Sequence, residues 1–250
     1  MPERRRRRRV PARAAGAAAV AALGHAFPSV CVLGQWVPVR LEALPAGACR
    51  WRGPASRMAV SLTFDDGPSP ANTPRTLDLL DELGWRVTFF VVGSLAAAHP
   101  ELVVEMRRRG HAVGLHGQQH RHHLLHSWRW IRRDTEEALR VLDDIGPRPR
   151  WYRPPYGQLS TPTLVEARRH RLEVVLWSAW GREWAEPDAS SVQARLAPRM
   201  EPGAVVLLHD SEEFAAAGTA RRTHETLRLL APVLSERGLQ AVTLDALVDG

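Results

Sequence analysis

The chain alternates strand-like and helix-like segments from Met58 to its end, and this alternation restricts the fold more than any other feature. Strand-like runs lie at residues 58–64, 86–92, 111–115, 150–153, 172–178, 203–208 and 239–243. About seven strands separated by helices predict an α/β fold, with a parallel sheet closed into a barrel. The carboxyl ends of the strands then form one rim, where the active sites of such barrels are built.

Proline and glycine mark where several helices begin and end. One helix is expected to begin at Thr73-Pro74 and to end at Gly84, and a second is expected from His99-Pro100 to Gly110. Thr161-Pro162 begins a third. Proline just inside the start and glycine just past the end is the usual asymmetry of helix termini.

The longest expected helix runs from Ser127 to Gly146. Its apolar residues recur at steps of three, four or seven, and they are Trp128, Ile131, Ala138, Leu142 and Ile145. Such a stripe is expected to face the sheet, while the intervening charged residues face solvent.

Two adjacent carboxylates follow the first strand directly, in the run Thr63-Phe64-Asp65-Asp66-Gly67-Pro68. Two neighbouring negative charges repel each other, and a divalent cation bound to one of them is a common compensation. The other carboxylate is then free to act as a base. The alternative is a solvated turn, which Asp-Gly-Pro sequences often form.

Six of the eleven histidines lie between His111 and His126. His116 and His120 are four residues apart, so on a helical turn or a curled strand-end loop they can share one ion. With an aspartate from another strand end they form a two-histidine, one-carboxylate set, as in open catalytic metal sites. His111 is expected to be structural. His122, His123 and His126 are interpreted as surface residues or as supports for the ligands.

Three further motifs complete a recognisable pattern. They are Arg153-Pro-Pro-Tyr-Gly157, the segment from Trp177 to Trp184, and Leu207-Leu-His-Asp210. With the runs at 63–68 and 116–120, they stand in the order found in polysaccharide deacetylases of the NodB-homology group, carbohydrate esterase family 4. From about Met58 to Leu247 the chain resembles this family. The resemblance implies a distorted (β/α) barrel, commonly of seven strands.

The resemblance also implies a role for each motif residue. Asp66, His116 and His120 would hold a divalent ion, usually zinc, with cobalt, manganese and iron left open. Asp65 would be the general base, His209 the general acid that protonates the leaving amine, and Arg153 the residue that orients Asp65. The backbone N–H of Tyr156 would help to bind the oxyanion. The residues that would contact the substrate are Pro155, Tyr156, Trp177, Trp184 and Leu207.

Three positions depart from the family pattern. Gly117 replaces a serine or threonine whose hydroxyl could hold the loop in place. Glu183 replaces an aspartate that tunes the acid histidine, and it is longer by one methylene group. Trp180 replaces another aspartate, which affects the sugar-binding rim.

Several of these residues also have structural interpretations. Trp177 and Trp184 fit core aromatics as well as a substrate wall, and His209 fits a buried core histidine. Asp210 is expected to support the site or to cap a helix.

The net charge of +7 is confined to the N-terminal part. Residues 1–50 carry nine arginines against two acidic residues, whereas residues 51–250 carry 25 of each. The balanced catalytic region therefore gives no reason to expect a nucleic-acid partner. Apolar residues make up 44% of the 250 positions, which suffices for one core and predicts a single catalytic domain at 57–248.

Residues 1–50 form a basic and alanine-rich extension. Arg4 to Arg9 precede the low-complexity stretch Ala14–Gly24, a layout typical of a signal peptide or membrane anchor. Membrane association and a location facing the cell envelope are therefore expected. The alternatives are a disordered arm that binds anionic lipid or nucleic acid, or a mis-assigned start codon, and for the location the cytoplasm. Cys31 and Cys49 would form one disulfide if the protein is exported, although their spacing does not require it.

The expected activity is metal-dependent removal of N-acetyl groups from an amino-sugar polysaccharide or glycan, such as peptidoglycan or chitin. One alternative is an O-acetyl polysaccharide esterase of the acetylxylan type. Another is a non-catalytic glycan-binding scaffold with the same fold. Substrate choice is expected to depend on the loops at 180–188 and 211–220.

Overall fold

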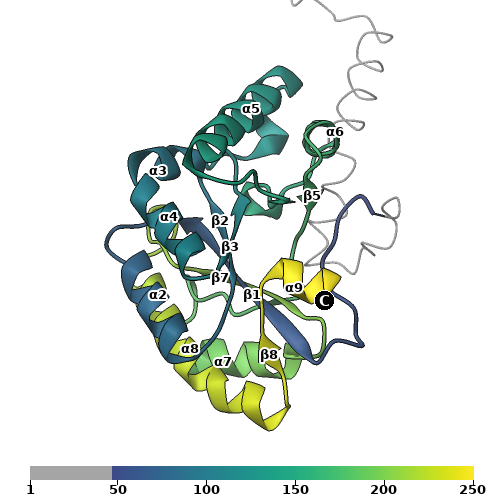
Figure 1. Cartoon of the computed structure of the whole chain (residues 1–250). Helices are drawn as coiled ribbons and strands as arrows, with labels where there is room; N and C mark the ends of the chain where they lie inside the picture. The colour runs from purple at the N-terminus through teal and green to yellow at the C-terminus, as the bar shows by residue number, and fades with distance from the viewer. Residues whose placement is uncertain (1–46) are drawn as a thin grey trace, which may run out of the picture.

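The computed structural model describes residues 47–250, and its strands run through the middle of the molecule with helices around them (Figure 1). The first strand, β1 (Ala59–Gly67), is central and pairs with β2 (Thr88–Val91) and β7 (Val205–His209). The sheet continues through β3 (Ala112–Leu115), β4 (Trp151–Tyr152) and β5 (Glu173–Val174) on one side and β6 (Ala179–Trp180) on the other. All these pairs are parallel, which confirms the predicted distorted (β/α) barrel.

Of the strand predicted at 172–178, only Glu173 and Val174 form a strand, β5, and a separate strand, β6, follows at Ala179–Trp180. Val175 N still donates to Tyr152 O of β4, but Ser178 N donates to Val205 O of β7. The chain therefore crosses from one end of the sheet to the other within four residues, which interrupts the ladder. The last strand, β8 (Gln240–Ala241), pairs only with the start of β1 among the described strands.

Eight α-helices lie in the described part of the chain: α2 (Thr73–Glu82), α3 (Gly93–Ala98), α4 (Pro100–Arg108), α5 (Trp128–Ile145), α6 (Thr161–Arg169), α7 (Ala189–Leu196), α8 (Thr219–Glu236) and α9 (Leu244–Asp249). Short 3-10 turns occur at η2 (His123–Leu125), η3 (Pro155–Gly157) and η4 (Ala197–Arg199). The predicted helix starts at Thr73, Pro100 and Thr161 are confirmed. The sequence pattern did not predict α3, α7, α8 or α9.

The apolar stripe of α5 is confirmed except at its first residue. Ile131, Ala138 and Leu142 are buried, but Trp128 is 49% exposed. The Trp128 indole N–H donates to Glu166 of α6 at 2.7 Å. A polar partner on the neighbouring helix thus keeps this ring at the surface instead of against the sheet.

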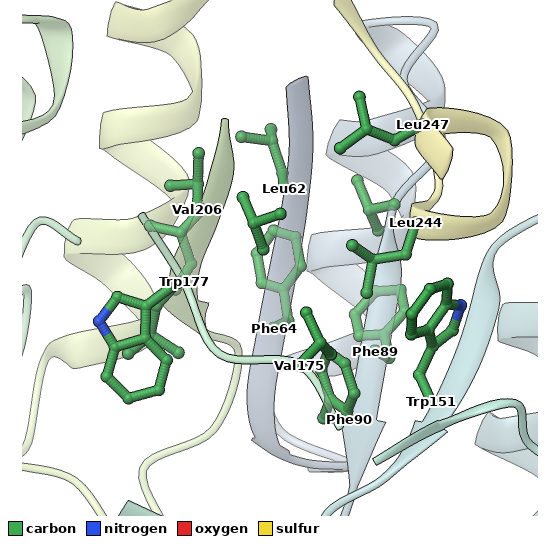
Figure 2. Close-up of a cluster of buried hydrophobic side chains, with 14 of the residues drawn as sticks. Leu62, Phe64, Phe89, Phe90, Trp151, Val175, Trp177, Val206, Leu244 and Leu247 are labelled. Atoms are coloured by element: carbon green, nitrogen blue, oxygen red, sulfur yellow. The ribbon is translucent and has the colours of Figure 1, made fainter. Parts of the chain in front are cut away.

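The core fills the space between the strands and the helices. All nine residues of β1 are buried, as expected for a parallel strand covered on both faces. Figure 2 shows Leu62, Phe64, Phe89 and the α9 residues Leu244 and Leu247 among the side chains of this cluster. Phe64 and Phe89 stack with their ring centroids 5.2 Å apart.

The segment before β1 is hydrogen-bonded to the sheet. Arg50 N donates to Val174 O, and Gly53 N donates to Gly203 O, each at 2.8 Å. Cys49 packs against the core, and burial raises the pKa of its thiol to about 12. The predictions for residues 1–46, including Cys31 and the membrane anchor, lie outside the described residues. Within residues 47–250, none of the helices has the length and apolar character needed to cross a membrane.

Two buried histidines should make the folded protein less stable in acid. His111 Nδ1 accepts the Val87 N–H, and His224 Nε2 lies 2.8 Å from Thr76 Oγ1. Burial lowers the pKa of each to about 4, so both are neutral in the folded protein at neutral pH. Because the unfolded chain binds these protons near pH 6.5, we expect stability to fall between pH 6.5 and 4, by about 2–3 kcal/mol per histidine.

Urea denaturation at pH 7 and pH 4.5 tests this expectation. His224→Gln should lose less stability on acidification than the parent protein. His99→Gln, at a partly exposed position, is the matched control and should behave like the parent. An equal acid loss in His224→Gln and the parent would contradict the assignment.

Candidate active site

The predicted site residues lie together at the carboxyl ends of the strands. Asp65 of β1 is directly opposite His209 of β7 in the parallel ladder. Asp66 follows in a left-handed conformation with φ 73°, at the point in β1 where the register with β2 shifts between Phe64 and Gly67. A cavity of about 290 Å³ opens here, and its walls include both aspartates, His116, His120 and His209. This volume is at the lower end of the range for small-molecule sites.

Three potential metal ligands converge at the base of this cavity. His116 Nε2 and His120 Nε2 lie 3.4 and 3.1 Å from Asp66 Oδ1. One donor atom from each residue lies within 4.8 Å of the other two, and all three side chains are nearly buried. Burial alone would raise the pKa of Asp66, but the two imidazoles outweigh it and lower the pKa. Two imidazoles and a carboxylate fit a divalent ion such as zinc.

A backbone carbonyl orients the first of these imidazoles. His116 Nδ1 lies 2.7 Å from Arg153 O, so this nitrogen carries the proton and donates. Nε2 is then left facing the space that it shares with the donor atoms of Asp66 and His120, where it would bind a shared ion, as in metal-ligating histidines.

Arg153 is fully buried and pairs with Asp65. Its Nη1 donates to Asp65 Oδ1 at 2.8 Å and to Thr63 Oγ1 at 2.7 Å. Its other nitrogens donate to the Val175 and Leu176 carbonyls, and its guanidinium lies 4.2 Å from the Phe90 ring centroid. Burial lowers the pKa of Arg153 although Asp65 opposes this, and arginine remains charged.

Glu183 reaches His209 despite its extra methylene group. Its Oε1 lies 2.6 Å from His209 Nδ1, and the carboxylate is fully buried. Burial alone would lower the pKa of His209, but the charge and hydrogen bond of Glu183 outweigh it and raise the pKa to about 9. His209 is therefore an imidazolium at neutral pH, with Nε2 3.9 Å from Asp66 Oδ2.

Tyr156 lies at the mouth of the cavity. Its backbone has φ 59°, and its side chain is 46% exposed. The ring stacks on His122 with centroids 3.7 Å apart, and His122 Nδ1 lies 3.0 Å from Gln158 Oε1. His122 thus supports the rim.

His123 and His126 differ from each other in burial. His123 is completely buried and bonds Thr163 of α6, so its interpretation as a surface residue is wrong. His126 is partly buried and stacks on Trp130.

Aromatic side chains form one wall of the cavity. Trp177, Trp180 and Trp184 follow one another with centroids 6.0 and 5.6 Å apart, and Leu207 completes this wall. Trp177 is only 8% exposed and belongs to both the core and the wall. A side chain at position 157 would lie 2.5 Å from the Trp177 ring, which explains Gly157. Pro155 is buried and is not among the residues that line the cavity.

Two contacts beside the site were not anticipated in detail. Asp210 is fully buried and accepts a hydrogen bond from Thr73 Oγ1 at the start of α2. Phe214 is 42% exposed and stacks on His120 with centroids 4.4 Å apart. The only sequence signal for Phe214 is a lone aromatic residue in the 211–220 loop, and the position of that loop depends on tertiary contacts.

Comparison with known proteins identifies the family. The model of the family described as "Polysaccharide deacetylase" matches residues 52–175. A peptidoglycan-N-acetylglucosamine deacetylase of Bacillus cereus is 30% identical over 213 residues, which cover 84% of this chain and 97% of the relative. The chain belongs to the polysaccharide deacetylase family. This polysaccharide deacetylase is therefore a hydrolase.

Two more comparisons extend this result. A chitooligosaccharide deacetylase of a Bradyrhizobium species is 34% identical to this polysaccharide deacetylase over 190 residues, covering 73% of the chain and 87% of the relative. The crystal structure of the Bc1960 peptidoglycan N-acetylglucosamine deacetylase superposes with a TM-score of 0.76 at 27% identity. That match covers 82% of this chain and 97% of the other.

Proposed function

We propose that this polysaccharide deacetylase removes N-acetyl groups from an amino-sugar glycan of the peptidoglycan or chitin type, with a divalent metal bound by Asp66, His116 and His120. One observation carries the proposal. The Asp65–Arg153 pair and the Glu183–His209 pair both lie within 4 Å of this ligand group. The names of the two relatives, which act on N-acetylglucosamine in peptidoglycan and on chitooligosaccharides, support an N-acetyl substrate.

The metal would act as a Lewis acid that makes water nucleophilic near neutral pH, and zinc is our first choice over cobalt, manganese or iron. Asp65 takes the proton from the attacking water. Arg153 binds Asp65 Oδ1, and Asp65 Oδ2 lies 3.8 Å from His116 Nε2. The guanidinium therefore fixes the orientation of the Asp65 carboxylate, with Oδ2 toward the ligand group.

His209 donates a proton to the leaving nitrogen. Its Nδ1 is bound to Glu183, so its Nε2–H faces the cavity. An amine leaves poorly unless it is protonated, and a charged histidine supplies that proton. The backbone N–H of Tyr156 binds the oxyanion. Trp177, Trp184 and Leu207 form the wall for the sugar, and Pro155 supports the turn that carries Tyr156.

Acetate release tests this proposal. The protein is stripped of metal, reloaded with Zn²⁺ and offered chitin oligosaccharides, peptidoglycan and acetylated xylan in parallel. Zinc-dependent release from either of the first two is the expected result. Release from xylan alone would instead support the O-acetyl esterase. No release together with no zinc bound would support the non-catalytic scaffold.

Substitution of Glu183 tests the acid. We expect Glu183→Gln to lower kcat/KM on chitin oligosaccharides by about 10- to 100-fold. Because Glu183 raises the pKa of His209, the neutral amide should lower that pKa by about 1–2 units. The acid must be protonated, so activity should begin to fall at a lower pH in the variant.

The pH dependence of kcat/KM in parent and variant measures this shift. Glu186→Gln is the matched control, since Glu186 lies on the same loop but pairs with Arg195 instead. An alkaline limb at the same pH in Glu183→Gln and the parent would rule out this role for Glu183.

We also infer that the protein acts in the cell envelope, because peptidoglycan is located there and one relative is named for it. The basic and alanine-rich residues 1–50 would direct export or hold the protein at the membrane, ahead of a catalytic domain at 57–248. Cell fractionation of the full chain and of a chain lacking residues 1–40 tests this. Equal amounts of both in the cytoplasm would contradict it.

A further inference from the structure

A buried carboxylate on α5 holds the loop that carries both histidines. Asp134 Oδ2 accepts the Gln118 N–H and Asp134 Oδ1 accepts the Gln119 N–H, each at 2.9 Å. Both oxygens of one side chain thus bind successive N–H groups between His116 and His120. Asp134 is 5% exposed and lies on a different element from the loop.

The other edge of the loop is bound by the start of α3. Gly93 N donates to Gly117 O at 2.8 Å, and Ser94 N donates to Gln118 O at 3.0 Å. The loop is not helical, so its own backbone does not determine the spacing of the two imidazoles. Its N–H groups and its carbonyls are instead held from two sides, by a side chain of α5 and by the backbone of α3.

Gly117 shows how closely the carboxylate approaches this loop. Its φ is +80°, and a Cβ at this position would lie 3.1 Å from Asp134 Oδ2. Where the family pattern has a hydroxyl residue that could hold the loop, this chain has a glycine that leaves room for Asp134. In this chain the Asp134 carboxylate holds the loop through its two N–H groups.

The position of Asp134 costs free energy. Burial raises the pKa of its carboxyl to about 6 despite the two hydrogen bonds from the loop. In the described part of the chain no basic side chain forms an ion pair with it. A buried carboxylate without a cation is unfavourable, so a neutral residue would serve α5 better if packing were its only task.

We propose that Asp134 is a positioning residue that holds the 116–120 loop so that both imidazole Nε2 atoms face Asp66, and that it thereby raises the metal affinity of the site. The proposal rests on the metal-binding role proposed above for Asp66, His116 and His120. Asp134 acts through the loop backbone and does not line the cavity.

Zinc affinity of the metal-free protein is the decisive measurement. Competition with a chromophoric chelator should show Zn²⁺ binding that is about 10- to 100-fold weaker in Asp134→Ala than in the parent. Asp134→Asn retains one acceptor and should show a smaller loss. Asp144→Asn, at an exposed position of the same helix, is the matched control and should bind zinc like the parent.

The visible absorption spectrum of the Co²⁺-loaded proteins separates positioning from mere stability. A loosened ligand set should change the band positions and intensities in both Asp134 variants and not in Asp144→Asn. Thermal unfolding of the metal-free proteins is recorded in parallel. If Asp134→Ala does not fold, the zinc affinity and cobalt spectrum of Asp134→Asn test the proposal instead.

Failure of the proposed metal site and failure of the proposed role of Asp134 give different results. A parent protein that binds no zinc overturns the proposed metal site and this inference with it. The role of Asp134 alone is overturned if both Asp134 variants bind zinc within twofold of the parent affinity and keep the parent's cobalt spectrum. This holds even if their metal-free forms unfold at a lower temperature.

Discussion

Asp65→Asn should reduce kcat on chitin oligosaccharides by about 10³-fold while one zinc ion stays bound per chain. A positioned general base contributes about 10²- to 10⁴-fold, and asparagine cannot accept the proton at neutral pH. The amide oxygen can still accept the hydrogen bond from Arg153, so the fold should be retained. Zinc should remain because the converging donor atoms come from Asp66, His116 and His120 and not from Asp65.

Acetate release and metal analysis of the same protein sample measure both parts of this prediction. Asp66→Asn is the matched comparison, because it changes the neighbouring carboxylate and should lose zinc as well as activity. Full activity in Asp65→Asn would show that the base is another group. Loss of zinc in Asp65→Asn would show that the two aspartates are not divided between base and ligand.

Arg153→Met should destabilise the protein by about 3–5 kcal/mol. Both partners of the Arg153–Asp65 pair are buried, so removing the guanidinium leaves an uncompensated carboxylate in the core. Thr63 and the Val175 and Leu176 carbonyls lose a donor at the same time. Activity should fall as well, because Asp65 loses the hydrogen bond that orients it.

A double-mutant cycle isolates this pair. If the unpaired Asp65 carboxylate causes the loss, the double variant Asp65→Asn, Arg153→Met should lose less free energy of unfolding than the two single variants together. We expect a difference of about 1–3 kcal/mol in urea denaturation. Arg108→Met is the control, since Arg108 forms only an exposed surface pair with Glu105 and its loss should change stability little. Additive losses would mean that Arg153 stabilises through packing alone.

The sequence by itself determined the strands, their alternation with helices and the chemical types at their ends. These signals are local: each lies within one run of the chain, such as the strand that ends in Asp65-Asp66 or the pair His116 and His120. Parallel strands in a barrel place their carboxyl ends on one rim, so the convergence of these residues followed from the order of the elements.

The tertiary structure alone decided which group holds each of these residues. Arg153 and Asp65 are 88 residues apart, and Asp134 lies 16 residues from Gln118 on another element. The early end of β5 at Val174, the exposed Trp128 and the buried His123 also depend on such neighbours. Residue type and local spacing carry no information about which distant segment packs against a side chain. The supports of the site therefore became visible only in the folded chain.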